Sequence, residues 1–313
     1  MQASRIRAMQ HTGTPVERRP PLCTIVIPTR RRPRLLAECL RSIAEADYPN
    51  ERLEVIVVDD GGGDAETAVA GMCGRLELSV LHFEGVGPAA ARNAGTERAA
   101  GEVVAFTDDD CRTSTGWLRA LVDALGKAPR QAAGGYTVNA LPSNRWSTAS
   151  QRIIDLVYAY YNANPRRATF LTTNNLAVPA AAFHDVGGFD ADFRTAEDRD
   201  FCRRWLARGL ELAYVPEALV LHAHALTMKA FVRQHFDYGR GAFRFHRRAG
   251  DQGDAQLRTV AGFYGSVPRL MRATVNGDGA AGVAKLAADL AIWQAANGAG
   301  FAWEAARSVA RKG

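Results

Sequence analysis

The sequence lacks the features that are typical of membrane-spanning proteins, exported proteins and proteins with structural zinc sites. No run of about eighteen or more apolar residues occurs in its 313 residues, so we expect no segment to span a bilayer. The first twenty residues carry four arginines but no apolar core of signal-peptide length, so we expect a cytoplasmic protein whose residues 1–21 form a disordered basic arm. The five cysteines are scattered and include no C-x-x-C pair, which argues for reduced, buried thiols.

Composition and charge set broad limits on the class of protein. Hydrophobic residues make up 47% and charged residues 23% of the chain, which are ordinary values for a globular protein with a sizeable core. The net charge of +6 comes from an excess of arginine and favours anionic partners. Nucleotide phosphates, acidic lipid headgroups and nucleic acid all satisfy this criterion.

Alternating strand and helix signals in the first half predict βαβ units and a mostly parallel sheet. The predicted strands there cover 24–28, 54–58, 78–83 and 103–107, and the predicted helices cover 33–47, 88–100 and 117–125. The second half is less regular, with expected strands at 172–179, 211–215 and 218–221, helices at 197–208 and 228–248, and an alanine-rich helical tail. The pattern therefore predicts an α/β fold with a helical segment at its C-terminal end.

Two of the predicted strands end in acidic residues. Asp59-Asp60 follows the second strand, and Asp108-Asp109-Asp110 follows the fourth. Parallel strands bring such ends to one edge of a sheet, where α/β proteins bind ligands. Three adjacent carboxylates repel one another, so we expect a divalent cation with oxygen ligands there. The alternative is a solvated acidic turn that caps the next helix.

Several motifs, in their order along residues 22–248, resemble those of family 2 glycosyltransferases with the GT-A fold. They are Val26-Ile27-Pro28-Thr29, Val57-Val58-Asp59-Asp60-Gly61, Ala91-Arg92-Asn93-Ala94-Gly95, Phe106-Thr107-Asp108-Asp109-Asp110, Gly187-Gly188-Phe189-Asp190 and Glu197-Asp198. The resemblance implies a mostly parallel, mixed sheet with helices on both faces. It divides the chain into a nucleotide-binding half at 22–126, an acceptor half at 127–226 and a C-terminal helical region at 227–313.

The activity that this resemblance implies is metal-dependent transfer of a sugar, with inversion, from a nucleoside-diphosphate sugar to an acceptor hydroxyl. The acceptor would be a glycan, a lipid-linked molecule or a small molecule, in polysaccharide or other glycoconjugate synthesis, and no nucleic acid partner is expected. The QxxRW signature of processive synthases is absent, which favours the addition of one or a few sugars.

The resemblance also assigns roles to individual residues. The nucleotide-binding set is Pro28, Thr29, Arg31, Asp59, Asp60, Arg92, Asp108, Asp109 and Arg240, with Asp60 and Asp59 at the base, Asp108 near the ribose and Arg240 at the diphosphate. The set for Mn²⁺ or Mg²⁺ is Asp108, Asp110 and His222, with His224 as second choice to His222. Asp198 is the catalytic base, and the acceptor-binding set is Asn174, Asn175 and Glu197.

Some of these residues have simpler alternatives. A histidine that follows a strand, as His222 does, often has a purely structural role. Asn174 and Asn175 also suit a turn, and Asp198 suits a first-turn acid that stabilises its own helix.

The predicted helix at 228–248 interleaves basic and aromatic residues. This pattern fits nucleic-acid binding, contact with an anionic membrane, or a helix that packs its aromatic side chains into the core. The tail adds an apolar stripe of Leu286, Leu290, Trp293 and Phe301. We therefore expect peripheral contact with the inner face of a membrane.

A rival enzyme class rests on Gly85-Val86-Gly87-Pro88-Ala89-Ala90, which matches the G-x-G-x-x-A fingerprint of dinucleotide-binding proteins. This alternative is an NAD-dependent oxidoreductase. The fingerprint follows the third strand rather than the first, which counts against it. A nonenzymatic nucleotide- or RNA-binding protein is the other alternative.

Overall fold

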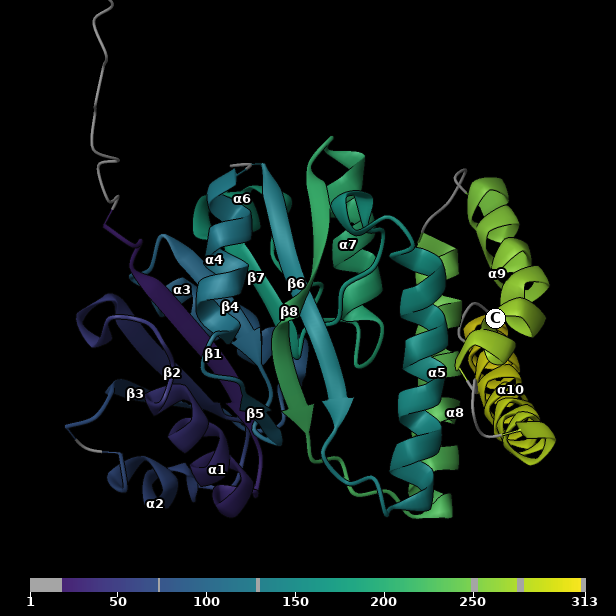
Figure 1. Cartoon of the computed structure of the whole chain (residues 1–313), viewed down its shortest axis with the longest axis horizontal. Coiled ribbons are helices and arrows are strands. Elements are labelled where there is room, and N and C mark those ends of the chain that lie inside the picture. Colours follow the sequence, from purple (N-terminus) through teal and green to yellow (C-terminus); the bar gives the residue numbers. More distant parts are fainter. Residues whose placement is uncertain (1–18, 73, 128–129, 249–252, 275–278, 311–313) are drawn as a thin grey trace, which may run out of the picture.

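The computed structural model describes residues 19–72, 74–127, 130–248, 253–274 and 279–310. The predicted basic arm at 1–21 therefore falls almost entirely outside the described residues. The described chain forms an eight-stranded mixed sheet covered by helices, with a group of helices that includes the C-terminal ones standing at one side (Figure 1). This arrangement confirms the expected α/β class with a C-terminal helical segment.

The sheet has the strand order β3-β2-β1-β4-β7-β6-β8-β5. The strands are β1 (Cys23–Thr29), β2 (Leu53–Asp59), β3 (Glu77–His82), β4 (Val103–Thr107), β5 (Cys111–Thr113), β6 (Gln131–Asn139), β7 (Asn175–Pro179) and β8 (Glu211–His222). The first four strands in the order β3-β2-β1-β4 are parallel, as the βαβ pattern predicts. β7 runs antiparallel to both β4 and β6, and β5 runs antiparallel to β8, so the second half of the sheet is mixed.

The helices lie between and after these strands. They are α1 (Pro33–Ala44), α2 (Ala65–Ala70), α3 (Pro88–Arg98), α4 (Trp117–Lys127), α5 (Arg145–Tyr161), α6 (Ala180–Val186), α7 (Glu197–Ala207), α8 (Met228–Arg248), α9 (Gly253–Thr274) and α10 (Gly279–Ala310), with short 3-10 turns at Asn50–Arg52 and Pro165–Arg167. No helix in the described part of the chain is both long and apolar enough to cross a bilayer.

Two hydrophobic cores lie on opposite faces of the sheet. Alternate residues of β1 divide between them: Ile25 and Ile27 pack with α1, α2 and α4, whereas Val26 packs with α3, α6 and α7. This two-sided burial explains why the parallel strands are continuous apolar runs. A third cluster joins α5 to the helices α8, α9 and α10 through residues such as Leu156, Phe231, Leu286 and Leu290.

Strand and helix signals are weakest in the middle of the chain. The sequence predicts neither β6 nor α5, because the pair Gly134-Gly135 breaks the strand pattern and the first turns of α5 are mostly polar. The two short strands expected at 211–215 and 218–221 form one strand, β8. A register shift between Gly135 and Tyr136 lets β6 follow β8 past Pro216.

Close packing and buried ion pairs hold α10 against the rest of the molecule. Gly300 faces α8 so closely that a side-chain carbon there would overlap the backbone carbonyl of Phe236. Asp289 of α10 is buried and binds the guanidinium of Arg145 at the start of α5. Glu304, also buried, accepts hydrogen bonds from two arginines of α8, at 2.9 Å from Arg240 and 2.8 Å from Arg244. Contacts from both ends of the helix therefore fix its position.

The close approach of α8 and α10 makes a stability prediction. Gly300→Ala should lower the free energy of unfolding by about 1–3 kcal/mol, because the added methyl group overlaps backbone that cannot rotate away. Gly298→Ala is the matched control in the same helix, since its added methyl group would meet no atom within 4 Å. The control should raise stability by about 0.5–1 kcal/mol, because alanine favours helix more than glycine does. Equal shifts for both variants in urea unfolding would contradict this packing.

Candidate active site

A cavity of about 610 Å³ opens where the carboxyl ends of the parallel strands meet the C-terminal helices. Pro28 and Thr29 line it from the end of β1, Asp60 from the residue after β2, and the three acids from the loop after β4. The far wall comes from α5, α7, α8 and α10. Eleven residues expected from the sequence line it: Pro28, Thr29, Asp60, Arg92, Asp108, Asp109, Asp110, Asn174, Glu197, Asp198 and His222.

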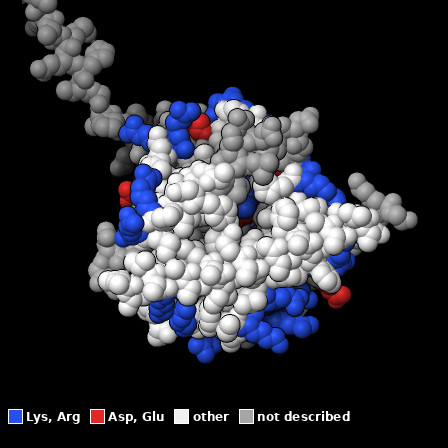
Figure 2. Space-filling model, turned by 90° about the vertical axis from the view of Figure 1, so that its right-hand side faces the viewer, with Lys and Arg blue, Asp and Glu red and all other residues white. Residues whose placement is uncertain are grey.

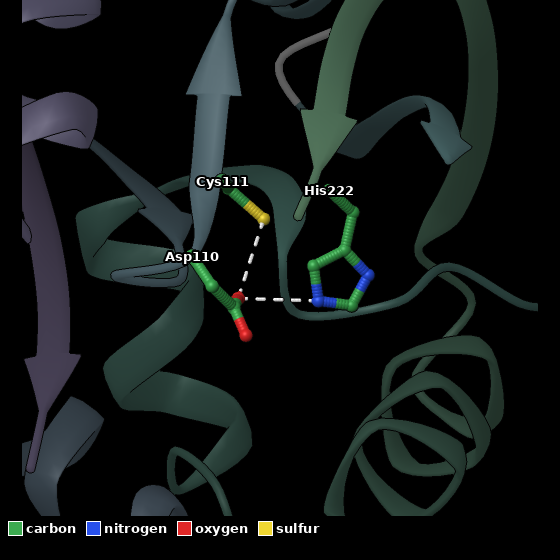
Figure 3. Close-up of side chains that lie close together, drawn as sticks. All are labelled: Asp110, Cys111 and His222. Atoms are coloured by element: carbon green, nitrogen blue, oxygen red, sulfur yellow. Dashed lines mark hydrogen bonds and ion pairs between the residues drawn. The ribbon is translucent and has the colours of Figure 1, made fainter. Parts of the chain in front are cut away.

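The ends of two different strands bring Asp110 and His222 together. His222 ends β8, which pairs with β5 directly after Asp110, and its Nε2 lies 3.1 Å from Asp110 Oδ1 (Figure 3). Burial opposes protonation of His222, but its hydrogen bond to Asp110 and the charges of Asp110 and Asp108 outweigh that effect and raise its pKa. Burial likewise opposes ionisation of Asp110, yet His222 and Arg32 hold its pKa below the usual range. The contact therefore favours a protonated imidazole beside an ionised carboxylate.

This donor set fits a divalent cation. Asp110, Cys111 and His222 each place one ligand atom within 4.8 Å of the other two. Cys111 is the weakest of the three, because complete burial raises the pKa of its thiol well above the usual value and keeps it protonated. A carboxylate and an imidazole that now share one proton would both be free to bind metal once that proton leaves. Asp110 and His222 are therefore the metal ligands that the geometry favours, with Asp108 two residues away.

Arg32 is a site residue that the sequence did not reveal. Its Nη1 lies 2.7 Å from Asp110 Oδ2 and 3.1 Å from Asp109 Oδ1, and its side chain is 48% exposed. The guanidinium therefore neutralises part of the acidic cluster while keeping access to solvent. Three consecutive arginines occur at 30–32, and only the loop after β1 shows which of them turns toward the acids. Arg31, the arginine expected in the nucleotide-binding set, does not line the cavity and has a left-handed backbone conformation with φ of 55°.

Arg92 joins the two acidic motifs. Its side chain is 4% exposed, and its guanidinium lies 2.6 Å from Asp108 Oδ1 and 3.1 Å from Glu197 Oε1. The predicted cation of the nucleotide site thus also holds the first turn of α7 against the loop after β4. One oxygen of Glu197 is occupied in this way, so its assignment to the acceptor stays a prediction.

Asp198 lies next to this ion pair, in the first turn of α7. Its Oδ1 accepts a hydrogen bond of 2.7 Å from the backbone N–H of Arg199. Removal from solvent and the charge of neighbouring Glu197 together raise the pKa of Asp198 to about 7, despite that hydrogen bond and the nearby arginines. A carboxylate that takes up a proton near neutral pH has the property that general-base catalysis needs.

The nucleotide side of the cavity is pre-organised by hydrogen bonds. Thr29 Oγ1 donates to Asp109 Oδ2 at 2.8 Å. Asp60 accepts the backbone N–H groups of Val86 at 2.6 Å and Gly87 at 2.9 Å. These are N–H groups of the loop that the dinucleotide alternative would use for a diphosphate, and Pro88 has none. The glycines at 85–87 therefore shape a loop around Asp60, which removes the physical basis of that alternative.

Three further assignments change in the light of the structure. Asn175 is fully buried, and its side chain bonds the indole of Trp117 at 2.8 Å and the carbonyl of Ala218 at 2.9 Å, so it is structural and does not reach an acceptor. Arg240 does not line the cavity, because Glu304 and Asp237 bind its guanidinium. Asp59 faces a separate, smaller hollow, where its Oδ1 accepts the N–H of Gly61 at 3.1 Å.

Asn174 keeps its place at the cavity. Its Oδ1 accepts the hydroxyl of Thr172 at 2.8 Å, and its side chain is half-buried. Its proposed contact with an acceptor remains a prediction. His224 also lines the cavity, with its ring centroid 5.1 Å from that of His222, but it is not part of the cluster around Asp110.

Comparison with known proteins is informative at this point. The family model described as "Glycosyl transferase family 2" matches residues 24–187. The chain is 31% identical over 231 residues to "Pre-mycofactocin glycosyltransferase" of Mycobacterium tuberculosis, which covers 70% of this chain and 46% of that protein. It is 25% identical over 225 residues to "Glycosyltransferase AglE" of Haloferax volcanii, covering 71% of this chain and 73% of that one. The chain thus spans about half the length of the mycobacterial relative.

Solved structures share the fold. The mannosyltransferase PcManGT from Pyrobaculum calidifontis, in complex with GDP-Man and Mn²⁺, aligns with a TM-score of 0.60 at 21% identity. The alignment covers 93% of this chain and 81% of that one. The likeness therefore extends beyond the family match into the C-terminal helices and confirms the expected GT-A fold.

Proposed function

The chain belongs to glycosyl transferase family 2, and we propose that it moves a sugar from a nucleoside-diphosphate sugar to an acceptor hydroxyl, with inversion and with a divalent cation. The observation that carries this proposal is one cavity with Asp110 and His222 on one wall and Asp198 on another. One wall suits a cation and a diphosphate, and the other suits a base. The mannosyltransferase of similar fold binds GDP-Man and Mn²⁺, which supports a donor and a metal of this kind here.

The residues divide the chemistry between them. Asp110 and His222 would hold Mn²⁺ or Mg²⁺, which stabilises charge on the leaving diphosphate when it is bound. Arg32, which lies 2.7 Å from Asp110, would add a positive charge beside the leaving diphosphate. Asp198 accepts the proton of the acceptor hydroxyl. At the same time the hydroxyl oxygen bonds to the anomeric carbon of the donor sugar, and the bond from that carbon to the diphosphate breaks. This single displacement inverts the anomeric centre and needs no covalent nucleophile.

Release of nucleoside diphosphate tests this proposal. The protein is incubated with UDP-glucose, UDP-N-acetylglucosamine, GDP-mannose or dTDP-glucose, together with simple glycosides and either Mn²⁺ or EDTA. Metal-dependent release of one nucleoside diphosphate, faster with a glycoside present, is expected. Equal release in EDTA would contradict the requirement for a divalent cation. Retention of the anomeric configuration in the product would contradict the single displacement.

The pH dependence follows from the raised pKa of Asp198. A base must be ionised to accept a proton, so kcat/KM should rise as pH increases through about 7 and then level off. His222 must also be neutral to bind metal, so its deprotonation likewise raises kcat/KM as pH increases. The profile should therefore be measured at two Mn²⁺ concentrations, since only the His222 limb shifts with metal. Constant kcat/KM from about pH 5.5 to 8 would contradict the role of Asp198.

We also propose that the outer face of α9 and α10 makes peripheral contact with an anionic membrane. Leu286 and Leu290, expected to contribute to this contact, are buried against α5 and α8 and are unavailable. The large hydrophobic residues exposed in the described parts of these two helices are Phe301, which belongs to the expected stripe, and Tyr264, Val283, Trp303 and Val309. Both acids of α10 are buried, and the exposed charges described on the two helices are Arg269, Arg272, Lys285 and Arg307. Figure 2 shows this mostly uncharged face edged by basic groups.

Vesicle binding checks the membrane proposal. The protein should sediment with vesicles that contain phosphatidylglycerol at low salt, and about 0.5 M NaCl should weaken binding, because salt screens the basic edge. Trp303→Ala should weaken it as well, since this side chain is 54% exposed. Phe83→Ala, which removes an exposed aromatic residue far from α9 and α10 in the sequence, is the control. No sedimentation at low salt would remove the proposal.

A further inference from the structure

The cavity extends past the acidic edge into a region walled by the helices α5, α8 and α10. Here α8 contributes Gln234, His235 and Tyr238, and α10 contributes Trp293 and Asn297. All five residues lie outside the part of the chain that the family model matches, residues 24–187. The family match therefore does not account for the part of this wall that α8 and α10 form, which is a place where a substrate particular to this protein would be recognised.

Charge separates this wall from the rest of the cavity. The opposite side carries Arg32, Arg92 and Arg194 together with the acids after β4. Among the described residues that line the cavity from α5, α8 and α10, Asp155 is the acidic one and no lysine or arginine is present. Burial raises the pKa of Asp155, and its carboxylate already accepts hydrogen bonds from Tyr136 and Gln151. A ligand that carries a phosphate or carboxylate would find no cation on this wall.

Two neighbouring side chains on this wall, His235 and Gln234, have unpartnered polar atoms among the residues that the structure describes. His235 is 3% exposed, and neither of its ring nitrogens has a hydrogen-bond partner among the residues that the structure describes. The side-chain oxygen of neighbouring Gln234 is unpartnered within the same described set. Burial lowers the pKa of His235 to about 4, so at neutral pH the ring offers one donor and one acceptor. A hydroxyl group can accept a hydrogen bond from the ring N–H or donate one to the other nitrogen, whereas a carboxylate can only accept.

Aromatic rings surround this imidazole. Its centroid lies 4.3 Å from that of Phe231 on the core side, and 5.4 Å and 6.4 Å from those of Tyr238 and Trp293, which line the cavity. The ring of Phe231 on the core side is thus closer to the imidazole than the rings of Tyr238 and Trp293 on the cavity side. Tyr238 is 42% exposed and offers ring surface to a ligand. Flat, uncharged rings, either sugars through their C–H faces or aromatic groups, pack well against such side chains.

We propose that this wall binds the acceptor, that the acceptor is an uncharged molecule with a hydroxylated ring, and that His235 with Tyr238 and Trp293 forms its specificity site. The inference rests on the proposed function, because it takes Asp198 as the base that the acceptor hydroxyl must reach. The position suits this role: Tyr238 lines the same cavity as Asp198, and the charge of Asp198 contributes to the raised pKa of the tyrosine. A ring held between α8 and α10 therefore lies in the same cavity as the proposed base.

Acceptor competition tests the chemistry of the site. The intact protein is given its donor, Mn²⁺ and three kinds of probe: neutral methyl glycosides, neutral phenols such as p-nitrophenol, and charged analogues such as glucuronic acid and glucose 6-phosphate. Neutral probes should be used with kcat/KM at least about tenfold above that of the charged ones. The glycoside and phenol arms distinguish a sugar ring from an aromatic ring. Preference for the charged probes would overturn the inference.

A histidine variant tests the specificity site itself. His235→Phe removes two unpartnered buried nitrogens, so the melting temperature should stay the same or rise, while KM for the neutral acceptor rises about tenfold and KM for the donor changes less than about twofold. His184→Phe, at an exposed histidine of α6 outside the cavity, should change neither constant. Trp293→Ala should also raise the acceptor KM, and this second variant keeps the test decisive if the first folds poorly.

The outcomes separate the inference from the function on which it rests. If a nucleoside diphosphate binds with metal but no neutral probe is used, or if both variants keep the normal acceptor KM, the acceptor site is wrong and the proposed function stands. If no nucleoside diphosphate binds under any metal condition, the proposed function fails and the inference fails with it.

Discussion

Asp110→Asn should abolish sugar transfer, with a loss in kcat/KM of about 10³-fold or more, and should leave the fold intact. The carboxylate of Asp110 contacts His222 at 3.1 Å and Arg32 at 2.7 Å, so it is the point where the acidic loop after β4 meets both the proposed metal ligand His222 and a cation. Asparagine keeps the shape but loses the charge. A metal that stabilises the leaving diphosphate contributes several kcal/mol to the transition state, and its loss accounts for an effect of this size.

Two measurements identify the cause of that loss. Mn²⁺-dependent binding of nucleoside diphosphate should disappear in Asp110→Asn, while circular dichroism and the unfolding transition remain those of a folded protein. Asp123→Asn, at an exposed aspartate of α4, is the matched control and should bind and react normally. Normal metal-dependent nucleotide binding by Asp110→Asn would show that the metal lies elsewhere.

Asp198→Asn should lower kcat by about 10²–10⁴-fold, because an amide cannot accept the proton of the acceptor hydroxyl. The expected pattern differs from that of the first variant. Asp198 lies on the α7 side of the cavity and has no hydrogen bond to Asp110 or His222 among the described contacts. Donor binding should therefore persist with an unchanged need for metal. The dissociation constant for the nucleoside diphosphate and single-turnover transfer, measured on one preparation, check both parts.

Asp185→Asn, at an exposed aspartate of α6, controls for the general effect of removing a carboxylate. Near-normal turnover of folded Asp198→Asn would contradict the assignment of the base. Loss of nucleotide binding in the same variant would instead place Asp198 in the donor site.

The sequence predicted the acidic edge of the sheet well, for a physical reason. Buried parallel strands are continuous apolar runs, which makes them easy to recognise in the sequence. Their carboxyl ends meet at one edge of the sheet, so acids directly after β2 and β4 are expected to lie close together. Asp60 and Asp110 line one cavity as expected. The same argument fails for Asp59, because adjacent residues at a strand end point to opposite faces, and this residue faces the other hollow.

The sequence could not predict contacts that depend on tertiary packing. The resemblance assigned Arg240 to the diphosphate, but Glu304, 64 residues later in α10, binds its side chain. Asn175 is satisfied by Trp117 and Ala218, which come from separate elements. Arg32 could be told from its arginine neighbours only by the path of the loop after β1. Each case was decided by a partner far away in the sequence.

The sequence likewise could not predict the proposed acceptor site on α8 and α10. The helix 228–248 was predicted with its bounds, yet its pattern could not show which aromatic residues face a cavity and which face the core. Phe231 is fully buried and packs against Trp146 of α5, whereas Tyr238 is 42% exposed and lines the cavity.

The central claim is that one cavity binds a nucleoside diphosphate through a metal, and thermal unfolding with a ligand panel tests it most directly. The melting temperature is recorded with UDP, GDP, dTDP and NAD, each with Mn²⁺, with Mg²⁺ and with EDTA, because a ligand that binds only the folded protein raises it. The account predicts a rise with one nucleoside diphosphate that requires the metal and is lost in Asp110→Asn. A rise with NAD alone, independent of metal, would contradict it.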